Sequence, residues 1–117
     1  MKPALMALLA LCLCLPLAGA DKAKPLPKDI PSLKALAEKG DAKAQNVLGR
    51  MYFKGEGERH DLVAAYAWMS ISASNSDSAS VRHKKMYAGF LDSDQITKAE
   101  ALVKEMIKKN PKLLKKK

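Results

Sequence analysis

Hydrophobic residues recur along this chain at spacings of three and four, which is the period of a helix buried along one face. The first such segment begins at Pro31 or Ser32 and stops at Gly40, and the second begins after Asp41 and stops at Gly55. An aspartate before a helix accepts hydrogen bonds from the first free N–H groups, and glycine readily adopts the left-handed conformation that ends a helix. The two segments therefore predict two helices joined by a tight turn.

The same spacing predicts two more helices in the middle of the chain. The third follows Asp61 and ends near Asn75, and the fourth begins after Ser76 or Asp77. The apolar side expected for the fourth helix is weak and consists of Val81, Met86, Ala88 and Phe90. No segment shows the alternation of a half-buried strand.

A fifth helix has the clearest boundaries. Asp92, with Gln95 three residues later, resembles a capping box, and Asn110 followed by Pro111 ends the pattern. Residues 113–117 are expected to fray. Five helices with short connections predict an all-α protein built from antiparallel helical hairpins.

The first twenty residues have the features of a secretory signal peptide. Lys2 precedes an apolar run over residues 4–15, and the small residues Ala18 and Ala20 occupy the −3 and −1 positions before Asp21. Cleavage after Ala20 predicts a periplasmic or secreted protein, and the alternative is an uncleaved anchor helix. Cleavage would leave 97 of the 117 residues, enough for one small domain.

Composition and charge divide the rest of the chain. Residues 21–30 contain closely spaced prolines and indicate an extended linker, residues 31–110 carry the helical pattern, and residues 111–117 form a basic, lysine-rich tail. The net charge is +9, and the stretch Lys104–Lys117 holds seven lysines against one glutamate. Both cysteines, at positions 12 and 14, lie in the signal peptide, so the mature chain has no thiol for a disulfide, a metal site or a nucleophile.

One spaced motif runs through the second and third predicted helices. It consists of Ala44, Gln45, Leu48, Gly49, Tyr52, Gly55, Gly57, Asp61, Ala65, Trp68 and Ala73. Residues 37–41 also align with residues 73–77 at an offset of 36, and at both places a helix end is followed by a turn and an aspartate. The motif resembles the Sel-one-like repeat, a helix-turn-helix relative of the tetratricopeptide repeat. Ser72 and Ser76 depart from it, since alanine and glycine are usual at these two positions.

The resemblance implies an all-α, right-handed superhelical solenoid of about 2.5 helical hairpins. It also implies a non-enzymatic adaptor of the bacterial envelope that binds a partner protein. In packing terms, the small motif residues would let paired helices approach closely, and the larger ones, Leu48, Tyr52 and Trp68, would fill the space between hairpins.

Asn46, Arg50 and Phe53 are the candidate partner-binding face. Their spacing of four and then three places them on one side of the second helix, at positions that the repeat motif leaves variable. The first helices of successive hairpins in a solenoid line a binding surface, and arginine and aromatic residues are frequent energetic anchors of interfaces. The alternative is that Phe53 packs under a neighbouring helix while the other two side chains are merely solvated.

The basic stretch Lys104–Lys117 supports a second hypothesis, in which the protein binds an anionic membrane or envelope surface electrostatically. The alternative is a solvated, frayed helix end. Nucleic acid is not expected as a partner, because an exported protein meets little of it and the tail has no aromatic residue to stack on bases. Self-association is a further possibility, since terminal repeats leave an apolar face unless they are capped.

Catalytic and metal chemistry find little support. His60 lies among Glu56, Glu58 and Asp61, but a glycine-rich loop does not make three or four ligands converge on a metal, so no metal or cofactor is expected. Some relatives of the repeat family are associated with β-lactam binding or hydrolysis, and those resemble cysteine-rich chains. The mature chain has neither cysteine nor a Ser-x-x-Lys sequence, so we expect no enzyme.

Overall fold

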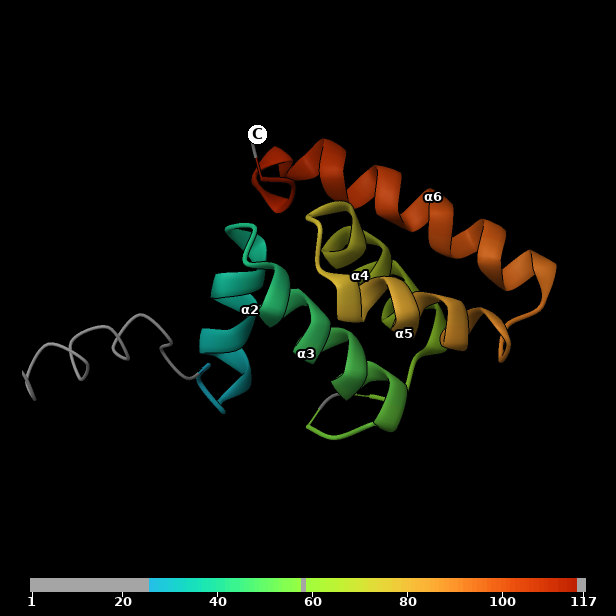
Figure 1. The fold of residues 1–117 in the computed structure, drawn as a ribbon, viewed down its shortest axis with the longest axis horizontal. Coiled ribbons are helices and arrows are strands. Elements are labelled where there is room, and N and C mark those ends of the chain that lie inside the picture. The colour runs from blue at the N-terminus through green and yellow to red at the C-terminus, as the bar shows by residue number, and fades with distance from the viewer. Residues whose placement is uncertain (1–25, 58, 116–117) are drawn as a thin grey trace, which may run out of the picture.

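The computed structural model describes residues 26–57 and 59–115, and all of its regular structure is helical. The five α-helices and one short 3-10 helix of these residues are α2 (Ile30–Glu38), α3 (Ala42–Lys54), α4 (Leu62–Ser74), α5 (Ser78–Ala88), α6 (Ser93–Lys109) and η1 (Pro111–Leu113). The all-α prediction is confirmed, with the five helices near their expected positions (Figure 1). The predicted signal peptide and the first half of the linker lie outside the described residues.

An aspartate side chain caps the N-terminus of every one of these five α-helices. Asp41, Asp61 and Asp92 cap α3, α4 and α6 as expected, and the capping box of Asp92 is complete. Of the two candidates for the fourth helix, Asp77 is the cap, since its side chain accepts a hydrogen bond from the Ser80 N–H. The first helix starts slightly earlier than expected because Asp29 serves as its cap.

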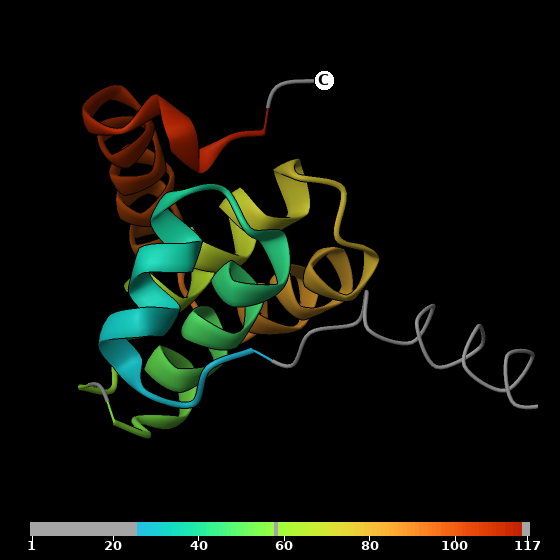
Figure 2. The same cartoon turned by 90° about the vertical axis from the view of Figure 1, so that its left-hand side faces the viewer.

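Helix α4 occupies the middle of the molecule, where α3, α5 and α6 all pack against it (Figures 1 and 2). Its buried residues therefore surround the helix instead of forming one stripe: Ala65, Tyr66, Ala67, Met69, Ser70, Ile71 and Ser72. α2 lies on the other side of α3, and α6 crosses the bundle so that its C-terminal end comes back toward α2 (Figures 1 and 2). Successive hairpins thus stack as in a solenoid.

Two hydrophobic clusters share Tyr52. One joins α4 to α5 and α6 through Tyr66, Met69, Tyr87 and Ala99. The other joins α2 to α3 through Leu33, Ala37, Ala44 and Leu48, and the half-buried Trp68 packs against it. A β-carbon at Gly49 would lie 3.2 Å from the Ala65 carbonyl oxygen and from the Met69 methyl carbon, so the absence of a side chain lets α3 approach α4 closely.

The apolar side expected for the fourth helix is wrong in most of its members. Val81, Met86 and Phe90 are 43%, 52% and 60% exposed. The inward face of α5 instead carries Tyr87, which is 3% exposed, and the hydroxyl of Ser80. Apolar periodicity misses such a face because a serine can be buried when its hydroxyl is hydrogen-bonded, as that of Ser80 is to Asn46 and Asp77.

The expectation that residues 113–117 fray is wrong for Leu113, which is 2% exposed. Its carbonyl oxygen accepts hydrogen bonds from the Gln45 and Asn75 side-chain amides at 3.0 and 2.8 Å, and the Asn75 side-chain oxygen accepts from the Lys115 N–H. Asn110 also donates to the Glu38 carbonyl. The segment after α6 therefore returns to the turns that end α2 and α4 and is fixed there.

Candidate functional site

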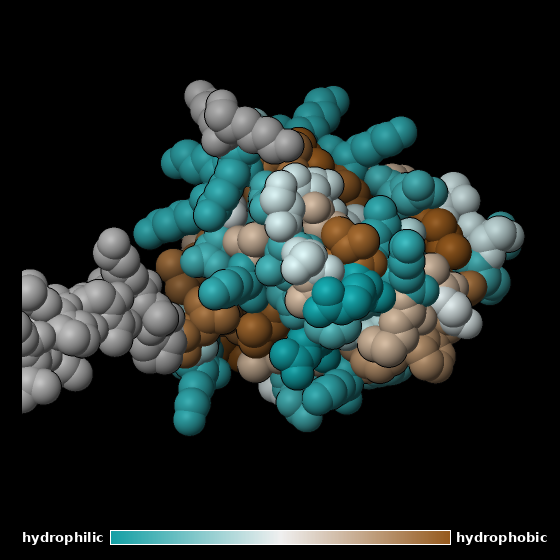
Figure 3. Space-filling view, viewed as in Figure 1, coloured by the Kyte–Doolittle hydropathy of each residue, from teal (hydrophilic) through white to brown (hydrophobic). Residues whose placement is uncertain are grey.

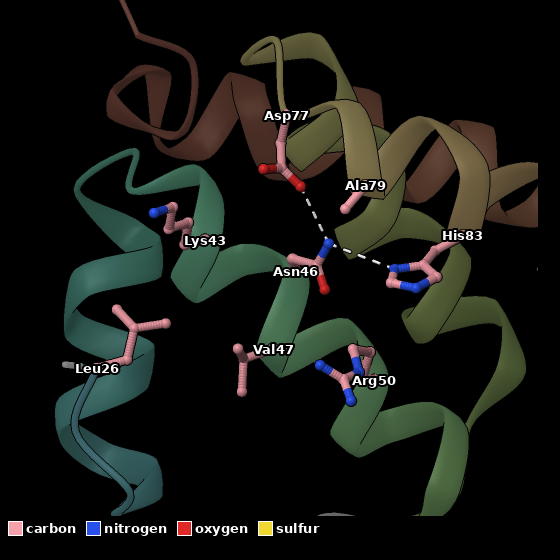
Figure 4. A pocket seen from close by; sticks show the side chains of 8 residues that line it. All are labelled: Leu26, Lys43, Asn46, Val47, Arg50, Asp77, Ala79 and His83. Carbon is pink, nitrogen blue, oxygen red and sulfur yellow. Dashed lines mark hydrogen bonds between the residues drawn. The ribbon is translucent and has the colours of Figure 1, made fainter. Parts of the chain in front are cut away.

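The candidate binding face forms a groove between α3 and α5, the first helices of two successive hairpins (Figure 4). The groove has a volume of about 300 Å³. Its lining comes from the N-terminal segment, from α3, and from the start of α5 with its cap: Leu26, Lys43, Asn46, Val47, Arg50, Asp77, Ala79 and His83. Two of the three predicted residues, Asn46 and Arg50, lie in this groove.

Asn46 is committed to the structure of the groove floor, with only 7% of the residue exposed. Its amide nitrogen donates to the Asp77 carboxylate at 3.1 Å and to the Ser80 hydroxyl at 2.7 Å. The same nitrogen lies 3.4 Å from Nδ1 of His83 (Figure 4). Asn46 therefore holds α5 beside α3. The sequence pattern does not indicate this role, because the repeat motif leaves the position of Asn46 variable.

The hydrogen bonds extend from the groove to α4. The Ser72 hydroxyl donates to the Ala42 carbonyl and lies 2.6 Å from the Ser80 hydroxyl. Ser72 is fully buried at a repeat position where alanine is usual. The departure from the motif thus links three helices, because one hydroxyl in α4 contacts both the start of α3 and the inward face of α5.

The charges around the groove shift two titratable groups. Burial would raise the pKa of Asp77, but hydrogen bonds from Ser80 and Asn46, helped by the charge of Lys43, hold that pKa below its ordinary value. Burial and the positive charges of Arg50 and Arg82 lower the pKa of His83. At neutral pH the groove therefore has an ionised Asp77, an uncharged His83 and the permanent charge of Arg50.

The third predicted residue, Phe53, lies one turn beyond Arg50, outside the groove lining. Its ring stacks on the buried Tyr87 with the ring centroids 4.1 Å apart and the planes parallel within 1°. Phe90 meets Phe53 edge-on at 5.4 Å, and the His83 ring lies 6.2 Å from the Tyr87 ring. The packing alternative therefore describes Phe53, which joins an aromatic cluster at the end of the groove.

Lys43, Ala79 and His83 belong to the groove and were missed from the sequence. The signal for two of them was present, because the offset of 36 that aligns the two turns also aligns Lys43 with Ala79 and Val47 with His83. Shifting the candidate residues of the second helix by 36 positions predicts that the fourth helix faces the second one. The spacing along a single helix does not predict this.

The predicted repeat residues occupy structural positions. Ala44, Leu48, Gly49 and Ala65 are buried, whereas Tyr52, Trp68 and Ala73 are half-buried. Gly55 and Gly57 have positive φ in the connection that follows α3, and Asp61 caps α4. Trp68 and Tyr52 also line a second hollow of about 440 Å³ together with Leu102 and Met106 of α6.

Within residues 26–57 and 59–115, no three His, Asp or Glu side chains converge on a position suited to a metal ion. His60 is exposed. The same part of the chain has no helix with the length and apolar character needed to cross a membrane.

Comparison with solved structures identifies the fold. A solved structure, that of c5321, a protective antigen of uropathogenic Escherichia coli strains with an SLR fold, superposes with a TM-score of 0.64 at 28% sequence identity. The chain has a Sel-one-like repeat fold. The match covers 70% of this chain and 18% of the antigen, so the chain spans less than a fifth of that protein's length. No family model and no curated protein sequence matches the chain.

The Sel-one-like repeat fold explains the arrangement of the helices. The motif residues of α3 and α4 form one complete hairpin, and α5 and α6 are the next pair of helices, both packed on α4. α2 packs on α3 as the second helix of a preceding hairpin would. The groove therefore occurs where the first helices of two Sel-one-like hairpins run side by side.

Proposed function

We propose that this protein is a non-enzymatic protein-binding module of the bacterial cell envelope and that a partner binds in the α3–α5 groove. The observation that carries the proposal is the groove itself, which has the exposed Arg50 at its edge and apolar contacts from Val47 and Ala79. Solenoids bind partners on surfaces formed by successive repeats, and the Sel-one-like fold supports such an interaction role.

The chemistry of the groove supports binding and does not favour catalysis. Its carboxylate, Asp77, accepts hydrogen bonds from Asn46 and from both the N–H and the hydroxyl of Ser80. A general base or nucleophile needs a free electron pair within reach of a substrate, whereas this carboxylate already serves as the cap of α5. β-Lactam turnover by the purified protein is the assay that would contradict this part of the proposal.

A photo-crosslinking residue in place of Lys43, an exposed residue that lines the groove together with Arg50, tests the binding site. We expect it to give a discrete adduct with an envelope protein, whereas the same residue in place of the exposed Lys98 on α6 should give none. Both positions are exposed lysines on α-helices, and Arg50 is retained in both variants. Identical adducts from both positions, or none from either, would contradict binding in the groove.

Export is a separate part of the proposal and rests on residues 1–20. N-terminal sequencing of the protein from a periplasmic fraction should begin at Asp21. Intact Met1 in a protein confined to the cytoplasm would refute the envelope location.

The C-terminal segment supports a second candidate function, binding to an anionic membrane surface. Lys112 and Lys115 lie with Lys39 around one hollow, together with Pro111 and Leu114. Each lysine near such a surface contributes about 1 kcal/mol. Exchanging Lys112 and Lys115 for glutamine should therefore weaken binding to phosphatidylglycerol vesicles. Equal binding of the wild type and this variant would contradict membrane binding through these lysines.

Glutamine exchange is preferable to truncation at Asn110, because truncation would also remove the buried Leu113.

A further inference from the structure

The basic residues of the helices are concentrated on the two that line the groove. α3 and α5 together carry six basic side chains and no aspartate or glutamate: Lys43, Arg50, Lys54, Arg82, Lys84 and Lys85. The other helices do not share this imbalance, since α4 has no charged residue, α2 has one of each sign, and α6 has three acidic residues against four lysines. Charge along the sequence alone indicates the lysine-rich tail instead.

Two of these six basic side chains, Lys43 and Arg50, line the groove. Among the residues that the structure describes, no carboxylate lies within ion-pair distance of Arg50 or Arg82. Asp77 stays ionised, but its oxygens are occupied by Asn46 and Ser80. An unpaired arginine fork beside a groove is complementary to a carboxylate, which it can bind through two parallel hydrogen bonds.

An apolar area continues the groove at one end. One turn beyond Arg50 and His83, the stacked Phe53 and Tyr87 rings meet Phe90, which is 60% exposed. Figure 3 shows hydrophilic side chains over the middle of this face and paler brown surface toward the C-terminal ends of α3 and α5. An exposed aromatic side chain beside a charged groove suits a partner that presents both acidic and apolar groups.

We propose that the α3–α5 groove binds an acidic peptide segment of its partner, with aspartate or glutamate side chains facing Arg50 and a large apolar side chain on Phe90. This inference rests on the proposed function and names the chemistry of the partner at that site. A peptide fits better than a bare polyanion because Leu26, Val47 and Ala79 supply apolar contacts within the groove and the exposed ring lies at its end.

The test uses a fluorescein-labelled peptide in which aspartate and glutamate alternate with serine and are followed by phenylalanine. Fluorescence anisotropy reports its binding to the full mature protein. Two matched probes replace the acidic residues by their amides or the phenylalanine by alanine. We expect the acidic probe to bind, and we expect the amide probe to bind about tenfold more weakly or not at all.

Two charge variants locate the binding. Arg50→Gln should lower the affinity for the acidic probe about tenfold and should reduce its salt dependence. Lys98→Gln removes the same charge from an exposed position of α6 outside the basic stretch Lys104–Lys117 and should change the affinity by less than about twofold. Arg50 is itself exposed, so the variant keeps the fold, and unchanged circular-dichroism spectra and melting temperature verify this.

Phe90→Ala tests the apolar end. It should lower the affinity for the acidic probe that ends in phenylalanine about fivefold. The affinity for the probe that ends in alanine should not change. Equal losses of affinity for Arg50→Gln and Lys98→Gln would overturn the inference. Full displacement of the acidic probe by inorganic polyphosphate, together with probe binding that Phe90→Ala does not change, would overturn it as well. If position 43 crosslinks to a partner but no acidic probe binds, this inference fails and the proposed function stands; if neither occurs, both fail.

Discussion

Gly40 and Ser76 occupy equivalent turns of the repeat, and both have a left-handed backbone, with φ of +98° and +69°. Glycine adopts this conformation without penalty, whereas a residue with a β-carbon does so at a cost of about 1–2 kcal/mol. A β-carbon at Gly40 would in addition lie 2.6 Å from the Lys112 carbonyl oxygen, so that turn also requires the space. Ser76 is exposed and meets only the backbone penalty.

Ser76→Gly should therefore stabilise the protein by about 1 kcal/mol, after part of the relief is offset by the greater freedom of glycine in the unfolded chain. Urea unfolding followed by circular dichroism measures the change. Ser74→Gly is the matched control: its position is helical and its hydroxyl donates to the Ser70 carbonyl, so the same substitution two residues earlier should destabilise. Destabilisation by Ser76→Gly would contradict the left-handed turn.

Asp77 makes the free energy of unfolding depend on pH. Its pKa is lowered in the folded state, so the unfolded chain takes up the proton first and the carboxylate contributes stability above about pH 4. This contribution is lost as the pH falls through the folded pKa.

We therefore expect Asp77→Asn to be less stable than the wild type at pH 7 and the gap to narrow below about pH 4. Thermal melts across this range measure it. Asp61→Asn is the control. Asp61 caps α4 by accepting one hydrogen bond from the Ala64 N–H, so its replacement should cause a smaller loss of stability than Asp77→Asn. A gap between the wild type and Asp77→Asn that does not change with pH would contradict the assignment.

At the scale of the elements, the boundaries could be predicted better than the contacts. The local sequence at Asp41, Asp61 and Asp92 predicts where helices start, because a capping side chain bonds to an N–H only three residues away. The inward face of α5 depends on a hydrogen-bond network that reaches from Ser80 to Asn46 and Ser72, and no local periodicity encodes it. The groove was half predicted for the same reason: Arg50 follows from one helix stripe, whereas His83 comes from the next hairpin.

η1 is the element that local reasoning missed most clearly. Lysines surround Leu113 in the sequence, so composition indicates a solvated tail, yet its carbonyl accepts from Gln45, which lies 68 residues earlier. Long-range contacts of this kind are invisible to any window of local sequence. In the sequence Gln45 is one position of the repeat motif. Its buried side-chain amide donates to the carbonyls of both Ala37 and Leu113 and thereby fixes the segment.

Leu113→Ala should lower the free energy of unfolding by about 2–5 kcal/mol, the usual cost of truncating a fully buried leucine. Leu114→Ala is the control from the next position, which is half-buried, and should cost clearly less. Denaturant titration of both variants provides the comparison. Equal, small losses would indicate that the segment is not packed in solution.

At the scale of the whole molecule, η1 changes how a short solenoid holds together. Repeats in a solenoid normally contact only their neighbours, so the terminal helices are the first to open. Here η1 packs on both α6 and α2, and it thereby connects the last helix of the chain to the first one described.

Hydrogen exchange should reveal this connection. In the wild type, the amides of α2 should exchange about as slowly as those of α6, because η1 makes them open together. In Leu113→Ala, α2 should exchange faster than α4, which remains enclosed by three helices. Uniform acceleration of all helices would instead mean that the molecule opens as one unit with or without the contact.

The place of Trp68 has a practical consequence. It is the single tryptophan of the chain, and it lines the hollow shared with Leu102 and Met106, which is separate from the groove that contains Arg50. Indole emission is therefore a built-in reporter for that hollow: its wavelength should stay constant while a ligand fills the groove and should shift only when something enters beside Met106. One fluorimeter trace can thus distinguish the two surfaces without any label.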